Sequence, residues 1–289
     1  MSAHGSDSTQ HIIQSLIVNL AIAIAKFGAA FFTGSGAMLA EAIHSFADCG
    51  NQLLLLRGVK ESRRPPDDKH PLGYGRNLYF WSFIVALLLF SGGGVFSIYE
   101  GIHHLRHPEP IENIGLALGI LGFALVLEGW STWGNIKELN IRRGTTPFYR
   151  FLKETKDSDL VVVFGENSAA VLGLTLALAA IALAKVTGHW EFDGLGSLLV
   201  GVVLVGVAIF LGVEVKSLLV GEAADPLITA TAVQLAIDHP KIEKMLACIT
   251  VQQGPGEVFV AIKVQIERMK MTADELVHVI NENEDALRA

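Results

Sequence analysis

Apolar residues along this chain gather into six long runs, and clusters of Gly, Pro and charged residues separate them. A helix needs about 20 apolar residues to cross the roughly 30 Å hydrocarbon core of a bilayer, and each run is about that long. The pattern therefore predicts an all-α transmembrane domain of six helices over residues 1–221 and a second domain over residues 222–289. The six predicted spans are 12–33, 37–56, 78–102, 114–133, 160–186 and 195–213.

Basic residues are concentrated in two of the connections between these runs. Segments 60–76 and 137–156 contain five and six lysines or arginines, whereas Arg106 and Lys185 are the only ones near the other long connections. Cytoplasmic loops carry this excess of positive charge, so both termini are predicted to be cytoplasmic. The polar start of the chain shows neither a signal-peptide nor a transit-peptide pattern, which favours a multi-pass protein of a bacterial inner membrane.

Composition supports this assignment and excludes other classes. The chain of 289 residues is 51% hydrophobic and only 18% charged, whereas a soluble domain carries about 25% charged residues. The formal net charge of −7 argues against nucleic-acid binding. Two well-separated cysteines, Cys49 and Cys248, make a disulfide framework improbable. No paired nucleophile and base and no zinc-hydrolase motif is present, so an enzyme is not predicted.

The periodicity changes after the sixth run and predicts the order helix, strand, strand, helix. Asp225 before Pro226 is a helix start, with the aspartate as N-cap. Runs rich in β-branched residues at 246–251 and 258–266 predict a hairpin, and residues 272–275 form a capping box for the last helix. A small α+β domain of this order usually has a further strand, so we expect the sequence to be truncated at its C-terminal end.

His44 and Asp48 stand four residues apart inside the second apolar run. A charged group at the bilayer centre costs about 2.5–3.5 kcal/mol on insertion scales, so an acid beside a histidine there indicates a functional site. Residues spaced by four lie on one stripe of a helix, where an imidazole and a carboxylate can bind the same cation. The alternative is a hydrogen-bonded pair that only fixes helix packing, and metal binding is the preferred interpretation.

Five segments occur in an order that resembles the cation diffusion facilitator family of divalent metal transporters. The resemblance implies six spans, a ferredoxin-like cytoplasmic domain, a homodimer, and metal export in exchange for protons by alternating access. The segments are 34–48 (GSGAMLAEAIHSFAD), 70–76 (HPLGYGR), 97–102 (SIYEGI), 192–197 (FDGLGS) and 219–226 (LVGEAADP).

The same resemblance implies that the second and fifth spans each contribute two metal ligands four residues apart. His44 and Asp48 provide the second-span pair. In the fifth span the family pattern places Val163 where a histidine is common and Asn167 where an aspartate is common, and Glu166 stands next to it. Glu166 shares a helix face with small residues, which points it into the bundle. Both Glu166 and Asn167 therefore remain candidate ligands, and one of the four usual ligands is absent.

Asp67, Asp68 and His70 resemble a second metal site found between the second and third spans of some relatives. Tyr74 stands where a further histidine would help to bind an ion. A solvated turn is the preferred interpretation of this segment.

These features predict a proton-coupled exporter of divalent metal ions, with Zn²⁺ as the preferred substrate and no prosthetic group. Imidazole and carboxylate ligands suit Zn²⁺ but also accept Mn²⁺, Fe²⁺ or Co²⁺, so an exporter of those ions is an alternative. A membrane scaffold or metal sensor that does not transport is another, because the fifth-span site is incomplete. His44 can carry the coupled proton, since its ordinary pKa lies near neutral pH.

Overall fold

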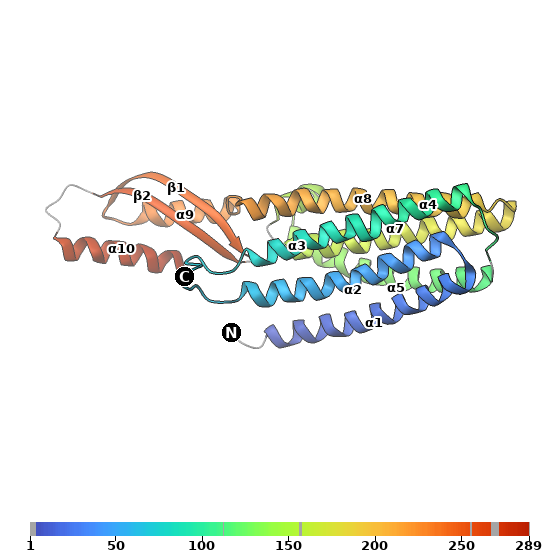
Figure 1. Ribbon diagram of the computed structural model, residues 1–289. Helices are drawn as coiled ribbons and strands as arrows, with labels where there is room; N and C mark the ends of the chain where they lie inside the picture. The colour runs from blue at the N-terminus through green and yellow to red at the C-terminus, as the bar shows by residue number, and fades with distance from the viewer. Residues whose placement is uncertain (1–3, 112, 156–157, 255, 267–271, 289) are drawn as a thin grey trace.

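The computed structural model describes the chain except for residues 1–3, 112, 156–157, 255, 267–271 and 289. In the described chain, six long helical segments lie alongside one another, and a smaller part with two strands extends from one end of them (Figure 1). The long segments are α1 (His4–Thr33), α2 (Gly36–Ser62), the combined segment Asn77–Arg106, α5 (Ile114–Arg143), α7 (Ser158–Thr187) and α8 (Glu191–Val220); the short α6 (Phe148–Glu154) precedes α7.

Four segments of the described chain are long and apolar enough to cross a membrane: Asn77–Arg106, Ile114–Arg143, Leu160–Thr187 and Glu191–Val220. Their outer surfaces carry large apolar side chains, and Trp130 and Val186 are 82% and 83% exposed. Exposed apolar surface of this kind is typical of a protein in lipid. Four predicted spans are thereby confirmed, and the chain is a membrane protein.

The first two predicted spans are also helical. The continuously described part of α1 contains the apolar stretch Asn19–Thr33, and α2 contains the buried polar residues Glu41, His44 and Asn51. A count of six spans therefore stays a prediction.

The third predicted span differs from the uninterrupted helix that its hydropathy suggests. It consists of α3 (Asn77–Leu88), the π-helical turn η1 (Leu89–Val95) and α4 (Phe96–Arg106). Three consecutive glycines, Gly92 to Gly94, lie in η1. Glycine has a low helix propensity, and π-turns occur mostly as short insertions within longer helices. An apolar pattern contains no signal for this change of hydrogen bonding.

Glycines let this segment approach α8 closely. A Cβ atom added to Gly101 of α4 would lie 2.5 Å from the backbone nitrogen of Leu198. One added to Gly201 of α8 would lie 2.7 Å from the backbone nitrogen of Ile98. Small residues at helix contacts are the usual means of close packing in a membrane, where lipid provides no hydrophobic drive for helix association.

The turn between α1 and α2 is held by a carboxylate from α8. Gly34 adopts a positive φ of 65°, and the Ser35 hydroxyl caps α2 by accepting a hydrogen bond from the backbone of Met38 at 3.2 Å. Asp193, at the start of α8, accepts hydrogen bonds from the Ser35 hydroxyl at 2.6 Å and the Gly36 backbone at 2.7 Å. The beginnings of α2 and α8 are thereby joined.

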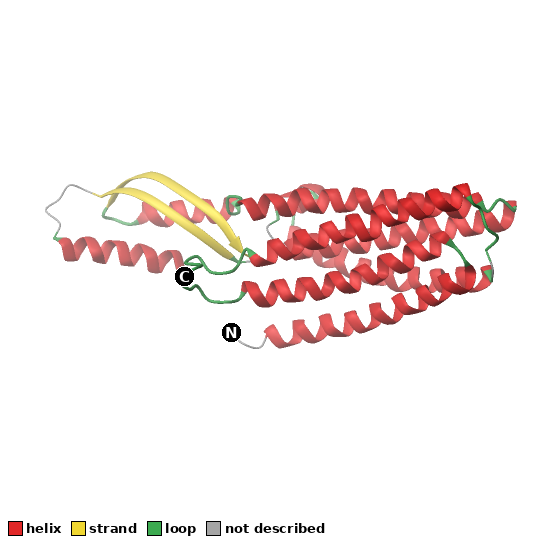
Figure 2. Cartoon of the chain, in the orientation of Figure 1, coloured by secondary structure: helices red, strands yellow, loops and turns green. Residues whose placement is uncertain are grey.

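The C-terminal part has the predicted order of elements (Figure 2). It comprises α9 (Pro226–Asp238), the antiparallel strands β1 (Ile242–Gly254) and β2 (Glu257–Ile266), and α10 (Ala273–Arg288). Asp225 accepts the expected capping bond from Leu227 at 2.7 Å, and Thr272 and Glu275 form the expected capping box. Because the described residues form two strands, a ferredoxin-like fold stays a prediction.

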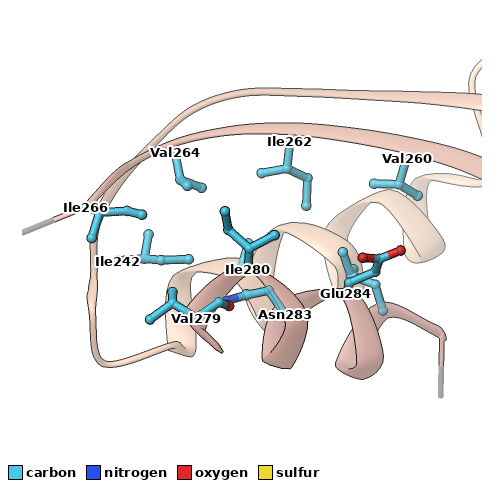
Figure 3. Close-up of a pocket in the computed structure, with 11 residues that line it drawn as sticks. Ile242, Val260, Ile262, Val264, Ile266, Val279, Ile280, Asn283 and Glu284 are labelled. Carbon is cyan, nitrogen blue, oxygen red and sulfur yellow. The ribbon is translucent and has the colours of Figure 1, made fainter. Parts of the chain in front are cut away.

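A groove lies between β2 and α10 (Figure 3). Val260, Ile262 and Val264 of the strand line one side, and Val279 and Ile280 of the helix line the other. The three strand residues alternate along β2 and so share one face of the sheet. This apolar face is the core side of the C-terminal part.

The α4–α8 packing predicts that substitutions at two glycines of α8 differ in their effect on stability. Gly201→Leu is expected to lower the free energy of unfolding by at least the roughly 1–3 kcal/mol typical of overpacked cores. Gly206→Leu is the matched control, because a Cβ at Gly206 meets no atom within 4 Å. Unfolding of the detergent-purified variants measures both effects. Equal stability of the two variants would contradict the close α4–α8 contact.

Candidate functional site

The polar residues of α2 face the interior of the helical part. His44 is fully buried, and its Nδ1 lies 3.5 Å from Oδ1 of Asp48, whose side chain is 14% exposed. This distance is long for a hydrogen bond. Within the described chain, both ring nitrogens of His44 and Oδ1 of Asp48 lack a hydrogen-bond partner. Buried polar atoms are nearly always paired, so these atoms are candidates to hold a ligand.

Glu166 on α7 lies opposite α2. Its carboxylate is buried and accepts a hydrogen bond of 2.6 Å from the Asn51 side chain of α2. It also interacts electrostatically with Asp48. Asn51 stands one turn beyond Asp48, so its amide holds the Glu166 carboxylate against the same face of α2 that carries Asp48.

Small residues bring α7 close to α2. Ala169, Ala170 and Ala177 of α7 are all buried. At Gly173 a Cβ atom would overlap the carboxylate of Glu41 on α2. The face that the sequence predicted from its small residues is therefore the buried face of α7, and Glu166 belongs to it.

Asn167, the other fifth-span candidate, points toward α5. Its side-chain amide lies 3.4 Å from the Ser131 hydroxyl, and its backbone carbonyl accepts a bond of 3.4 Å from Thr132. The structure thus directs Glu166 to α2 and Asn167 to α5. Val162 and Val163, one turn before these residues, carry no ligand atom.

The side chains of His44, Asp48 and Glu166 lie between α2 and α7 but are too far apart to bind one ion together. In the described residues, the ligand atoms of His44, Asp48 and Glu166 do not all lie within 4.8 Å of one another. Ligand atoms around a tetrahedral Zn²⁺ are separated by about 3.4 Å. Binding one ion with all three groups therefore requires the α2 and α7 side chains to move closer together.

A buried ion pair that the sequence analysis does not single out lies beside this site. Lys26 of α1 is fully buried, donates a 2.7 Å hydrogen bond to the Ser45 hydroxyl, and lies 3.4 Å from Glu41. The signal was available in the sequence, because Lys26 is the only ionisable residue in the apolar run 12–33. An isolated lysine in an apolar span needs an acidic partner, and Glu41 is that partner.

The segment after α2 is arranged as a self-contained turn. Asp67 accepts hydrogen bonds from the backbone nitrogens of Lys69 and His70 at 3.0 and 2.8 Å, and from the Tyr74 hydroxyl at 2.6 Å. The Tyr74 bond, followed by the backbone bond from His70, lowers the pKa of Asp67 to about 2. Because both oxygens of Asp67 are engaged within the turn, the structure does not assemble Asp67, Asp68 and His70 as a three-ligand group.

The Lys26–Glu41 ion pair leads to a prediction about stability. Lys26→Met leaves the Glu41 carboxylate buried without its counter-ion, which is expected to lower the free energy of unfolding by about 3–5 kcal/mol. Adding Glu41→Met in the double variant removes that charge and is expected to recover most of the loss, because apolar replacements of a whole buried pair are often neutral. Denaturant unfolding of purified protein measures both. Additive losses in the double variant would contradict the pairing.

Comparison with known proteins agrees with this architecture. The family profile described as the cation efflux transmembrane domain matches residues 12–220. The human "proton-coupled zinc antiporter SLC30A9, mitochondrial" is 34% identical over 253 residues, which cover 87% of this chain and 44% of the human protein. "Metal tolerance protein C4" of Arabidopsis thaliana is 31% identical over 252 residues, 86% of this chain and 55% of that protein.

The match to a bacterial relative covers a larger share of that relative's length. "Cation-efflux pump FieF" of Escherichia coli is 25% identical over 265 residues, 88% of this chain and 82% of the pump. This chain spans only about half the length of the human and plant relatives. The profile nevertheless covers all six long helical segments from residue 12 onward, which confirms the resemblance drawn from the sequence. The chain therefore belongs to the cation efflux family, the cation diffusion facilitators that transport divalent metals.

Proposed function

We propose that this protein exports divalent metal ions, with Zn²⁺ as the preferred substrate, in exchange for protons. The observation that carries the proposal is the buried His44–Asp48 pair, whose ring nitrogens and Oδ1 have no hydrogen-bond partner in the described chain. Retaining such groups inside an apolar bundle costs several kcal/mol. A transported cation offsets that cost whenever it occupies the site. The zinc antiporter named among the relatives supports the same substrate.

In this proposal Glu166 is the ligand from α7, and Asn167 is not. The Glu166 carboxylate faces α2 and is held by Asn51, whereas Asn167 faces α5. One imidazole, two carboxylates and a water molecule make a tetrahedral Zn²⁺ site with one exchangeable position. Mn²⁺, Fe²⁺ and Co²⁺ are accepted by the same ligand types, so competition among these ions determines the preference.

The separation between the α2 and α7 ligands suits alternating access. The side chains of His44, Asp48 and Glu166 close around an ion in one state and move apart in another, which permits release. Metal binds imidazole and carboxylate in their deprotonated forms. Binding at His44 therefore expels a proton from the site, and release of the metal allows a proton to return.

The membrane arrangement follows from the positive charge of the loops. We propose that α1 and α2 complete a set of six spans in the domain 1–221, with both termini in the cytoplasm of a bacterium. Residues 222–289 then form a cytoplasmic domain of ferredoxin-like type, through which two copies form a homodimer. The basic segments 60–76 and 137–156 lie on the same side as this domain in the proposed topology.

Transport into liposomes separates the two fifth-span candidates. Glu166→Gln is expected to reduce pH-gradient-driven Zn²⁺ uptake by at least the 10–100-fold that loss of a metal-site partner typically costs. Asp48→Ala is expected to abolish uptake, and Asn51→Ala to reduce it because the Glu166 carboxylate is then unsupported. Asn167→Ala, the matched neighbour, is expected to stay within about twofold of the wild type.

Two outcomes would contradict parts of this proposal. Loss of uptake in Asn167→Ala with normal uptake in Glu166→Gln would assign the ligand to Asn167. Folded wild-type protein that moves none of Zn²⁺, Mn²⁺, Fe²⁺ and Co²⁺ would favour the sensor or scaffold function. Tryptophan fluorescence and gel filtration of each variant establish that it is folded.

A further inference from the structure

A second set of metal-ligating side chains lies at the end of α4, on a different helix from the His44–Asp48 pair. Glu100, His103 and His104 each offer one ligand atom, and these atoms lie within 4.8 Å of one another. The spacing of three and four residues places all three on one face of α4. This end of α4 is at the opposite end of the helical part from the strands and α10 (Figure 1).

His104 is held in place from two sides. Its Nε2 lies 3.2 Å from the Glu100 carboxylate, and its Nδ1 lies 3.7 Å from the Asp193 carboxylate. The ring packs over Gly36, where a Cβ atom would lie 2.7 Å from its Cδ2. A histidine that binds a metal usually directs its second ring nitrogen to a carboxylate. In His104 the second ring nitrogen faces the Asp193 carboxylate at 3.7 Å, an ion-pair distance that is longer than a hydrogen bond.

Asp193 is itself fixed by contacts outside the cluster. It is 2% exposed and accepts hydrogen bonds from Ser35 and Gly36 at the start of α2. The carboxylate that faces His104 therefore does not depend on His104 for its own position. This is the pre-organisation that a metal site requires of the groups behind its ligands.

His103 provides an adjustable third ligand. It is exposed, and its ring centroid lies 6.0 Å from that of His104. Ligand atoms around tetrahedral Zn²⁺ are about 3.4 Å apart, close to the 3.2 Å between Glu100 and His104. A rotation of the exposed His103 side chain closes the remaining gap, and water can take the fourth position.

We propose that Glu100, His103 and His104 bind one divalent transition-metal ion of the Zn²⁺ type. Two imidazoles and a carboxylate favour Zn²⁺ or Co²⁺ over Mg²⁺ and Ca²⁺, which prefer oxygen ligands alone. An ion bound there fixes His104 beside Asp193. It thereby ties the end of α4 to the starts of α2 and α8. In the proposed topology the site lies on the side of the membrane to which metal is exported, and its existence does not depend on transport.

Metal binding to the full-length protein in detergent tests this site. Zn²⁺ binding is measured by equilibrium dialysis in an Asp48→Ala background, so that the α2 site does not contribute. Each of Glu100→Gln, His103→Ala and His104→Gln is expected to remove one bound Zn²⁺ per chain or to raise its Kd at least tenfold. The absorption spectrum of bound Co²⁺ is expected to lose its tetrahedral bands in the same variants.

His189→Ala is the matched control, because His189 is an exposed histidine at the same end of the helices and lies 3.6 Å from the Glu191 carboxylate. It is expected to leave Zn²⁺ binding unchanged. Unchanged stoichiometry and Kd in His103→Ala, or an equal loss in His189→Ala, would overturn the proposal. His103→Ala decides the matter if His104→Gln does not fold, because His103 is exposed. Failure of transport in liposomes has no bearing on this result.

Discussion

The cost of keeping polar groups inside an apolar helix bundle constrains this structure more than any other interaction. An unpaired buried charge or amide costs several kcal/mol, and α2 brings four such groups into the interior. Glu41 is paired with Lys26 of α1, and Asn51 is paired with Glu166 of α7. Those two contacts position α1 and α7 around α2. Both ring nitrogens of His44 and Oδ1 of Asp48 are left without a hydrogen-bond partner in the described chain, and these two side chains mark the site.

Close approach of the helices makes these pairings possible. Gly173 of α7 leaves the space that the Glu41 carboxylate occupies, and the neighbouring alanines bring Glu166 within reach of Asn51. Van der Waals packing and hydrogen bonds drive such association in lipid. Small residues on one helix and polar residues on its neighbour therefore act together. The small residues allow the two helices to approach closely. The polar residues determine which rotation of each helix lets the buried polar groups form hydrogen bonds.

The start of α2 shows how one carboxylate can serve both fold and chemistry. Asp193 completes the hydrogen bonding of the turn before α2, as an acidic side chain at a helix N-terminus commonly does. It also stands 3.7 Å from His104. The end of α4 is thus tied to the helix that carries His44 and Asp48, so an ion bound by α4 would bear on the position of α2. The two proposed metal sites are therefore linked through one structural element, the start of α2.

Local patterns in the sequence determined the helical class, four confirmed spans, the order and caps of the C-terminal elements, and the stripe shared by His44 and Asp48. Each depends on residues a few positions apart, which hydropathy, capping and helical period relate directly. The choice of Glu166 over Asn167 to face α2, the π-turn η1, and the approach of His104 to Asp193 came only from the tertiary structure. Those features depend on how whole helices rotate and pair, and contacts between residues far apart in the chain decide this. A periodic apolar pattern is compatible with several rotations of each helix.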